Sequence, residues 1–313
     1  MSCTVLVAGS ANLDFVARAA HVPAPGETVL GREFRTFPGG KGANQAVACA
    51  RAGGADTRML LALGNDDFAR PIEASLLAAG VKLHTVRDAQ LPTGTAFVCL
   101  SDDAENAITV APGANLALQP GHLPALDGVQ WLLLQLETPL DTVLAYARAA
   151  RAAGVKVALN AAPAQALPDA LLAQLDMLIV NEGELAVVAG DPPDLATGLA
   201  RLDVPCVIVT LGARGCLARE AGRTLLQPAF SIAPVDTTAA GDTFCGTLVA
   251  ALARGQALQQ ALLAASAASA LACTRLGAQS SIPDTAGVAA LLADATRVPG
   301  ADAHAALAAW CAL

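Results

Sequence analysis

The chain has no excess of positive charge. Over its 313 residues, 19 Lys and Arg stand against 27 Asp and Glu, so the formal charge is −8. Proteins that bind nucleic acid usually present a basic patch to its phosphates, so nucleic acid is not an expected partner. The deficit does not exclude a phosphate on a small ligand, because backbone N–H groups and a few cations can hold one.

Cysteine patterns typical of metal sites and disulfides are also missing. The cysteines are scattered, with no C-x-x-C pair and no His at ligand spacing: Cys3, Cys49, Cys99, Cys206, Cys216, Cys245, Cys273 and Cys311. The histidines are isolated as well: His21, His84, His122 and His304. A zinc site and a disulfide framework are therefore not expected. We predict buried free thiols, as in a reducing cytoplasm.

No stretch has the pattern of a membrane span or a leader. The most apolar stretch, Ala257 to Cys273, is interrupted by Gln259, Gln260 and Ser266, so we predict a buried helix there. No charged leader precedes the strand pattern Thr4 to Ala8. A cytoplasmic location without a membrane partner is expected.

The sequence does contain an alternation of short apolar runs and helical patterns. The predicted strands are Val5–Ala8, Met59–Leu63, Trp131–Leu136, Val155–Leu159, Met177–Val180 and Val207–Thr210. The predicted helices are Gly42–Ala52, Ala69–Ala79, Leu140–Ala153, Gly241–Arg254 and Leu258–Cys273. Such alternation predicts an α/β fold, with a mostly parallel sheet covered by helices on both faces. No linker or repeat divides residues 1–313, which we predict to form a single domain.

Two segments break this alternation. Thr28–Thr36 and Thr95–Val110 have extended, half-apolar patterns, and Asp102 and Asp103 mark a polar turn in the second. We predict that they form a small accessory sheet outside the main one. Such a sheet would be a lid over the carboxyl ends of the main strands, where ligands bind in open α/β folds.

The stretch from Asp236 to Phe244 carries the strongest functional signal. Small residues lead to Gly241, which opens directly into an apolar helix. The first N–H groups of such a helix are unpaired and lie at its positive end, which makes an anion site. Asp242 in that first turn has two interpretations: it caps the helix, or it takes a proton from a hydroxyl that attacks a phosphate.

A second glycine-rich loop, Pro38 to Gln45, precedes another helix. It is neither a Walker A loop nor a G-x-G-x-x-G motif. Its glycines allow a ligand to approach the backbone, and Lys41 and Asn44 offer polar contacts to a hydroxylated ligand. A plain loop before a helix remains the alternative.

Polar side chains follow several predicted strands. Asn12 and Asp14 alternate after the first strand, which suits sugar hydroxyls if the chain stays extended, or an Asx turn if it does not. Glu137 closes another strand. Asn181 and Glu184 form either a capping box or a site that orders water around Mg²⁺.

The glycines from Thr210 to Gly215 follow a further strand. They suit either the approach of a phosphate or a hairpin turn.

These motifs, in this order, resemble the ribokinase family of carbohydrate kinases, which includes the phosphofructokinase B type. Two signatures carry the resemblance: Gly39-Gly40-Lys41-Gly42-Ala43-Asn44, and Asp236-Thr237-Thr238-Ala239-Ala240-Gly241-Asp242. Further similar segments are Pro25–Thr28, Gly113–Asn115, Gln135–Glu137, Asn160–Pro163, Asn181–Glu184, Thr210–Gly212 and Gly277–Gln279. The likeness spans nearly the whole chain.

The resemblance implies transfer of the γ-phosphate of ATP to the primary hydroxyl of a furanose, with D-ribose expected. Asp242 would be the base, and the N–H groups of Ala240, Gly241 and Asp242 the anion hole. The implied sugar contacts are Asn12, Asp14, Gly39, Gly40, Lys41, Asn44, Glu137 and Asp242. The implied ATP contacts are Asn181, Thr210, Gly212, Gly215, Gly241 and Ser266.

The family's ions and assembly are implied in the same way. Mg²⁺ would be held through water by Glu184. The implied K⁺ ligands are Asp236, Thr238, Ala272, Arg275, Gly277 and Ser281. A homodimer formed through the lid strands is also implied. Ser266 departs from the Asn or His that relatives often place against adenine.

Other functions fit parts of the pattern. A kinase of another furanose or of a nucleoside shares the signatures, but Lys41 with Asn12, Asp14 and Glu137 favours a small free sugar. A non-catalytic sugar sensor would not need the intact Asp242. A dinucleotide-dependent oxidoreductase is disfavoured because no G-x-G-x-x-G follows the first strand.

Overall fold

A computed structural model describes residues 4–101 and 106–312. Its main sheet has nine strands in this order: β13 (Arg223–Pro228), β12 (Gly215–Glu220), β11 (Cys206–Thr210), β10 (Met177–Asn181), β9 (Lys156–Asn160), β8 (Val129–Leu134), β1 (Thr4–Ala8), β4 (Asp56–Gly64) and β5 (Lys82–Asp88). The pairs from β5 to β11 are parallel, whereas β12 and β13 add an antiparallel edge. The predicted mostly parallel sheet is confirmed.

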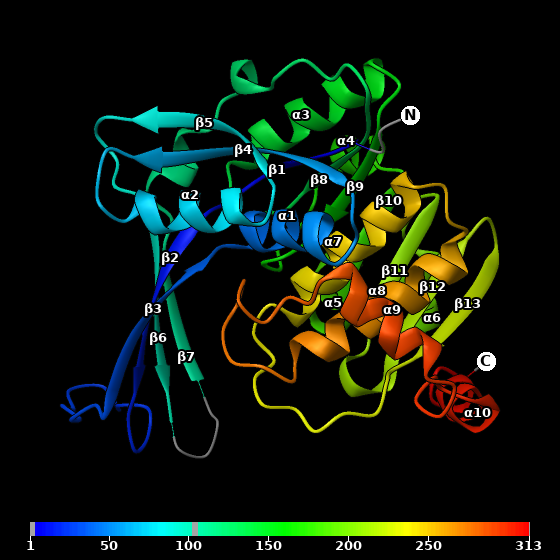
Figure 1. Ribbon diagram of the computed structural model, residues 1–313. Coiled ribbons are helices and arrows are strands. Elements are labelled where there is room, and N and C mark those ends of the chain that lie inside the picture. Colours follow the sequence, from blue (N-terminus) through cyan, green and yellow to red (C-terminus); the bar gives the residue numbers. More distant parts are fainter. Residues whose placement is uncertain (1–3, 102–105, 313) are drawn as a thin grey trace.

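Helices cover both faces of this sheet (Figure 1). On one face lie α1 (Lys41–Arg51), α2 (Ala69–Ala78), α7 (Ala240–Ala253), α8 (Leu258–Ala272) and α9 (Thr285–Ala293). On the other lie α3 (Leu140–Ala152), α4 (Asp169–Leu172), α5 (Glu182–Val188), α6 (Leu195–Ala200) and α10 (Ala301–Trp310). The alternation along β1 explains the two cores, because Val5 and Val7 pack on the first face and Leu6 and Ala8 on the second.

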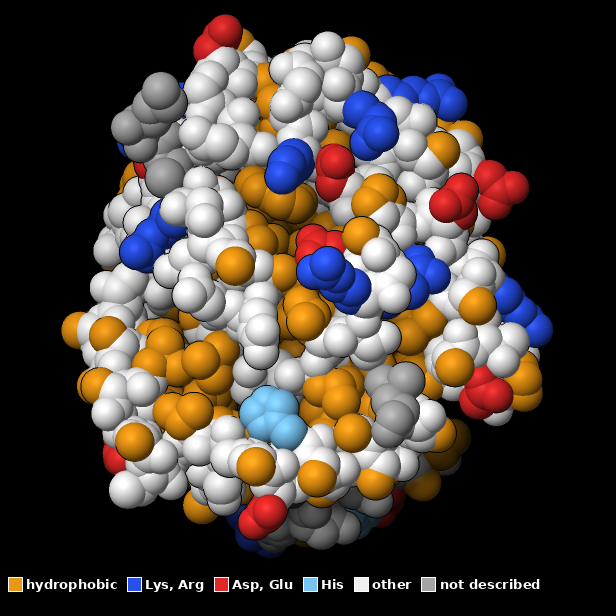
Figure 2. Space-filling view, turned by 90° about the vertical axis from the view of Figure 1, so that its right-hand side faces the viewer, with side chains coloured by type: hydrophobic (Ala, Val, Ile, Leu, Met, Phe, Trp, Pro, Cys, Tyr) orange, Lys and Arg blue, Asp and Glu red, His pale blue; other side chains and the backbone are white. Residues whose placement is uncertain are grey.

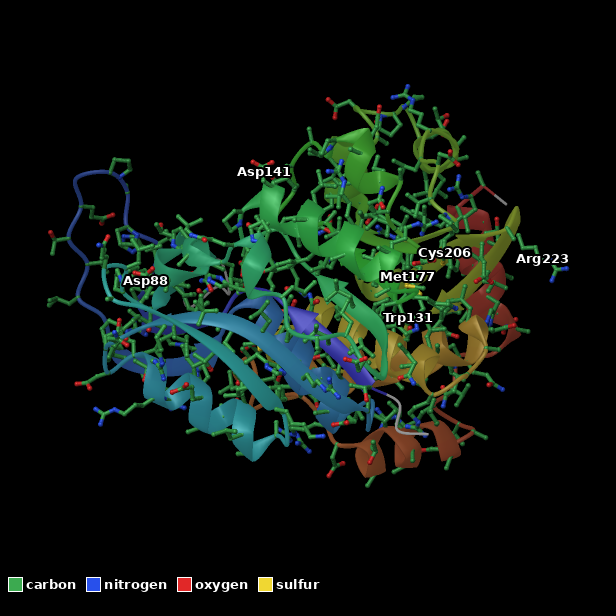
Figure 3. The ribbon with its side chains drawn as sticks, turned by 90° about the horizontal axis from the view of Figure 1, so that it is seen from above. Asp88, Trp131, Asp141, Met177, Cys206 and Arg223 are labelled. Carbon is green, nitrogen blue, oxygen red and sulfur yellow. The ribbon has the colours of Figure 1, made fainter. Side chains whose placement is uncertain are left out.

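The sheet has a clear polarity, which locates the ligand edge (Figure 3). Trp131, Met177 and Cys206 lie near the amino ends of β8, β10 and β11, on one side of the view. Asp88 ends β5 and Asp141 lies in the first turn of α3, after β8, and both appear on the opposite side. Loops at that carboxyl edge carry the candidate residues.

A separate four-stranded sheet projects from this edge, and we call it the lid sheet (Figure 1). Its order is β3 (Glu33–Gly39), β2 (Asn12–Arg18), β6 (Gly94–Leu100) and β7 (Asn106–Ala111). The accessory sheet predicted from the sequence therefore exists. The strand predicted at Thr28–Thr36 is displaced, because residues 28–32 form no strand and Leu30 is 89% exposed. The predicted turn at 102–103 lies outside the described residues.

The lid sheet also includes a strand that the sequence pattern did not reveal. Asn12 and Asp14 belong to β2, which pairs with both β3 and β6, so the Asx-turn alternative is wrong. The extended backbone places Asn12, Asp14 and Val16 on the same face.

Side chains on the face that carries α10 and β13 are mixed in type. Basic and acidic side chains are interspersed there, with apolar groups in the hollows between them (Figure 2). Within the described part of the chain, the cysteines are free thiols, all buried except Cys99. No helix in the described ranges has the length and hydropathy that crossing a bilayer requires.

Candidate active site

The turn before α7 leaves backbone donors free. Ala239, the N-cap residue, has a φ of 58°, which turns the chain sharply into the helix. The Ala240 N–H donates to the Thr237 carbonyl at 3.2 Å, so it is not one of the free donors that we expected. The N–H groups of Gly241 and Asp242 have no acceptor among the described residues, and a Cβ on Gly241 would meet nothing within 4 Å. This turn can bind an anion.

Asp242 is held by side-chain amides and is not a cap. Its Oδ2 accepts from Asn44 Nδ2 at 2.9 Å, and its Oδ1 from Gln45 Nε2 at 2.9 Å. The N-cap of α7 has no side-chain hydrogen bond. The capping interpretation of Asp242 is therefore wrong, and the carboxylate is fixed in an orientation set by α1.

A cavity of about 500 Å³ lies between the lid sheet and the carboxyl edge, and we call it the lid cavity. It brings together most of the expected sugar contacts: Asn12, Asp14, Gly40, Lys41, Asn44, Glu137 and Asp242. Gly39 does not line it and lies behind Asp14, since a Cβ there would be 2.1 Å from the Asp14 carboxylate. The buried Asn44 Oδ1 has no partner and is available to accept from a hydroxyl.

Residues without an assigned role orient two of these side chains. Asn115 Nδ2 donates to Asn12 Oδ1 at 2.7 Å, which leaves the Asn12 amide N–H groups for a ligand. Glu137 Oε2 accepts from Ser10 Oγ at 2.5 Å and from the Lys41 N–H at 3.1 Å. Glu137 therefore also holds the start of α1. Asn115 stands in a segment similar to the family, but its position gave no sign of this contact.

The lid cavity concentrates negative charge. Burial, together with the charges of Glu137 and Asp242, raises the pKa of Asp14 from 3.8 to about 7. Burial alone would lower the pKa of Lys41, but Asp242, Glu137 and Glu184 outweigh it and the pKa lies above its ordinary value. Lys41 thus stays charged among carboxylates.

A second cavity, of about 470 Å³, lies beside β11, and we call it the β11 cavity. It gathers five of the six expected ATP contacts: Thr210, Gly212, Gly215, Gly241 and Ser266. The hairpin alternative also holds, because β11 and β12 are antiparallel around the short turn Gly212–Arg214. The same glycines therefore make the turn and line the cavity.

A smaller cavity of about 180 Å³, the α5 cavity, joins the other two at the turn before α7. Asn181, Glu184 and Lys41 line it together with Asp242. Asn181 and Glu184 form a capping box, with the Asn181 N–H donating to Glu184 Oε2 at 2.8 Å. Burial raises the pKa of Glu184 above its ordinary value. The capping alternative is correct in geometry, and the carboxylate also faces this cavity.

Asp236 ties together two loops near the anion turn. Its carboxylate accepts from the Thr238 N–H and the Gly277 N–H, each at 2.9 Å. Among the described residues, no cationic side chain pairs with it. Three other residues implied as K⁺ ligands lie in the sequence around Gly277. Ala272 and Ser281 are buried, whereas Arg275 is exposed.

The alanine-rich end of the chain touches the β11 side of the site. Arg214 pairs with Glu182 at 2.6 Å, and its guanidinium lies 4.0 Å from the centre of the Trp310 ring on α10. This contact joins the turn after β11 to the start of α5. The sequence pattern of α10 gave no indication of it.

The three cavities meet where unpaired N–H groups and a fixed carboxylate lie side by side. Such an arrangement can hold an anionic group between two small-molecule ligands.

Comparison with known proteins identifies the class. The sequence pattern of the family described as "pfkB family carbohydrate kinase" matches residues 3–285. A ribokinase of Haemophilus influenzae is 37% identical over 295 residues, covering 90% of this chain and 96% of that protein. A ribokinase of Bacillus subtilis is 35% identical over 294 residues, covering 92% and 99%. The chain belongs to the pfkB family of carbohydrate kinases, which confirms the resemblance seen in its motifs.

A solved structure supports the same conclusion. The Arabidopsis thaliana ribokinase complexed with ribose and ATP has a TM-score of 0.85 and 33% identity, covering 93% of this chain and 99% of that one. The fold and the enzyme class are therefore those of a ribokinase-type carbohydrate kinase.

Proposed function

We propose that this kinase transfers the γ-phosphate of ATP to the 5-hydroxyl of D-ribose. The observation that carries the proposal is the place of Asp242. It lines both the lid cavity and the α5 cavity, beside the free N–H groups of α7. The relatives named above are ribokinases, and one was solved with ribose and ATP.

The lid cavity would hold the sugar. Asn12 presents amide donors, Asn44 presents an unpaired oxygen, and Asp14 and Glu137 present carboxylates. A set that contains both donors and acceptors suits neighbouring ring hydroxyls. Asp242 at one end of this set would take the proton of the attacking hydroxyl.

The phosphates would lie at the turn before α7. The free N–H groups belong to Gly241, which lines the β11 and α5 cavities, and to Asp242, which lines the lid and α5 cavities, and Lys41 lines the lid and α5 cavities. Phosphoryl transfer depends on positioning and on neutralising the charge of the equatorial oxygens, which fixed donors supply before reaction. The nucleoside would occupy the β11 cavity, beside Ser266.

The residues present fit Mg²⁺ bound mainly by phosphates and water. Within the described residues, no group of three or more His, Cys, Asp or Glu forms a metal cage, while the Glu184 carboxylate faces the α5 cavity. Mg²⁺ usually keeps several waters and takes few protein ligands. When bound with the nucleotide, it would neutralise phosphate charge, and Glu184 would hold its water.

The lid sheet would close over the sugar and pair with a second copy. Ile108 and Val110 line the lid cavity yet remain 56% and 42% exposed, so an apolar part of this face is uncovered in one chain. Closure would exclude water from the phosphate. We further propose one domain for residues 1–313 and, given the free buried thiols, a cytoplasmic location.

The test of the function is ADP release with Mg-ATP and K⁺, across D-ribose, 2-deoxyribose, fructose, tagatose and several nucleosides. We expect the highest kcat/KM with D-ribose. A preference for another furanose or a nucleoside would support phosphoryl transfer from ATP but contradict D-ribose as the acceptor. Folded protein without turnover on any acceptor would contradict the proposal and favour a sugar sensor.

K⁺ stimulation should depend on Asp236. The residues fit such a cation, because the Asp236 carboxylate has no cationic side-chain partner in the described ranges and lies between the loops that carry Thr238 and Gly277. In Asp236→Ala we expect K⁺ stimulation to disappear, so that the ratio of turnover in KCl to turnover in NaCl, measured at equal ionic strength, falls to about one. Asp236→Asn keeps the shape of the side chain and one of its two acceptor oxygens, so it separates loss of the charge from loss of the whole side chain. Equal rates of the unaltered enzyme in both salts would contradict the site.

The Asp14 carboxylate should lower the stability of the folded protein at high pH while it contributes to sugar binding. Its pKa of about 7 in the folded protein exceeds 3.8, so the unfolded chain loses this proton first as pH rises. The contribution of Asp14 to the free energy of unfolding therefore falls between about pH 4 and 7 and is level above that range. We compare the free energy of unfolding of Asp14→Asn with that of wild type at pH 5 and at pH 8. We expect the difference in favour of the variant to be larger at pH 8 by on the order of 2 kcal/mol, after allowance for partial exposure.

Urea unfolding at the two pH values measures this gain, and sugar affinity should fall in the same variant. Asp302→Asn, an exposed carboxylate on α10, is the control. A pH-independent difference between wild type and Asp14→Asn would show that Asp14 does not titrate in this range.

A further inference from the structure

Gln45 is a fully buried polar residue that the proposed function does not use. It lies on α1, next to Asn44, with 0% of its surface exposed, and it lines none of the cavities described above. A buried amide without partners costs about 1–3 kcal/mol, so its contacts need a full account.

Every polar atom of this side chain is engaged. Gln45 Nε2 donates to Asp242 Oδ1 at 2.9 Å and to Asn160 Oδ1 at 3.0 Å. Its Oε1 accepts from Gln135 Nε2 at 2.7 Å. Because Nε2 has two hydrogens, both are used, and one of them reaches the carboxylate of the candidate base.

The direction of these bonds is fixed from the main sheet. Asn160, at the end of β9, donates from Nδ2 to the Ile179 carbonyl of β10 at 3.2 Å. Because the Ile179 carbonyl can only accept, the Asn160 amide nitrogen must face it, and Asn160 Oδ1 faces Gln45. Gln45 must then donate to that oxygen from Nε2. The sheet thereby sets the orientation of the amide that contacts Asp242.

The carboxylate is held at both oxygens by consecutive residues of one helix. Asn44 binds Oδ2 and Gln45 binds Oδ1. Rotation of an Asp carboxylate about its Cβ–Cγ bond is otherwise broad, so two donors define its plane where one would not. Asn44 also faces the lid cavity, whereas Gln45 contacts only protein.

We propose that Gln45 is a positioning residue of the phosphoryl transfer. It holds the Asp242 carboxylate in the plane from which that group accepts the hydroxyl proton, and it acts through Asp242 without contacting the sugar or the nucleotide. This proposal rests on the proposed function.

The test compares Gln45→Met with Gln227→Met on β13. Both glutamines are buried and take the same substitution, but Gln227 donates to the Pro228 carbonyl, and only Gln45 contacts Asp242. We expect kcat to fall about 10- to 100-fold in Gln45→Met, the range for losing one hydrogen bond to a charged group. The sugar Kd should stay within about threefold, and Gln227→Met should keep both quantities within about threefold.

Gln45→Glu gives a readout that a packing role would not move. In its neutral form the introduced carboxyl donates one O–H, which can replace a lost N–H. Burial raises the pKa of such a carboxyl. As pH rises through that value the donor disappears, so kcat of this variant should fall relative to wild type with increasing pH. This profile decides the matter if Gln45→Met does not fold.

Several outcomes would overturn the proposal. They are wild-type kcat in Gln45→Met, an equal loss in both Met variants, or a pH profile of Gln45→Glu parallel to wild type. If wild type turns over sugar and Asp242→Asn does not, these results reject only the role of Gln45. If wild type is inactive on every acceptor, the proposed function itself fails.

Discussion

Asp242→Asn is expected to lower kcat by about three orders of magnitude, the loss typical of removing a general base. Asparagine keeps the size of the side chain but cannot take a proton from the sugar hydroxyl. It also turns an N–H toward Asn44 Nδ2 or Gln45 Nε2, where the carboxylate accepted. The helix should persist, because Asp242 does not cap it.

Single-turnover kinetics and sugar affinity measured on the same samples separate chemistry from binding. We expect the sugar Kd of Asp242→Asn to stay within a few-fold of wild type. Asp14→Asn, a carboxylate of the same cavity, is the matched control and should lose mainly affinity. Turnover of Asp242→Asn close to wild type would remove Asp242 as the base.

The parts of the fold that follow local pattern were predictable. Runs such as Val5–Ala8 and Val207–Thr210 are apolar on both sides, as strands covered on both faces must be, and they lie in the main sheet. The small residues before Gly241 predicted the helix start, whose geometry leaves two N–H groups free. Here the local chain alone determines the outcome.

The parts that depend on distant partners were not predictable. Only three residues separate β2 from β1, and β2 is a strand because β3 and β6 pair with it. Residues 28–32 have an extended pattern but no partner strand, so β3 starts at Glu33.

The site shows the same division. Spacing brought Asp242, Lys41 and Asn44 into consideration, but it could not show which amides hold the carboxylate. Gln45 is a polar residue in a helix rich in small residues, and its partners Gln135 and Asn160 lie at least 90 positions away. Such contacts arise only when α1, β9 and α7 are packed together.

That packing is tight at Gly246, which gives the second prediction with a large expected effect. Gly246 on α7 faces α1, where an added Cβ would lie 2.4 Å from the Gln45 carbonyl oxygen and 2.6 Å from Ala48 Cβ. Because the nearest atom belongs to the backbone, the helices must separate. We expect Gly246→Ala to cost about 3 kcal/mol, as overpacked cores do, and to lower Tm by about 5 °C.

The same change should reduce kcat at least tenfold, because Asp242 lies one helical turn before Gly246 and its two amide donors lie on α1. Calorimetry and ADP release on one preparation measure both effects. Gly287→Ala on α9 is the control, since its nearest neighbour at 3.3 Å is an exposed side-chain atom. If Gly246→Ala kept the wild-type Tm and kcat, the close contact of α1 with α7 would not be what fixes the carboxylate.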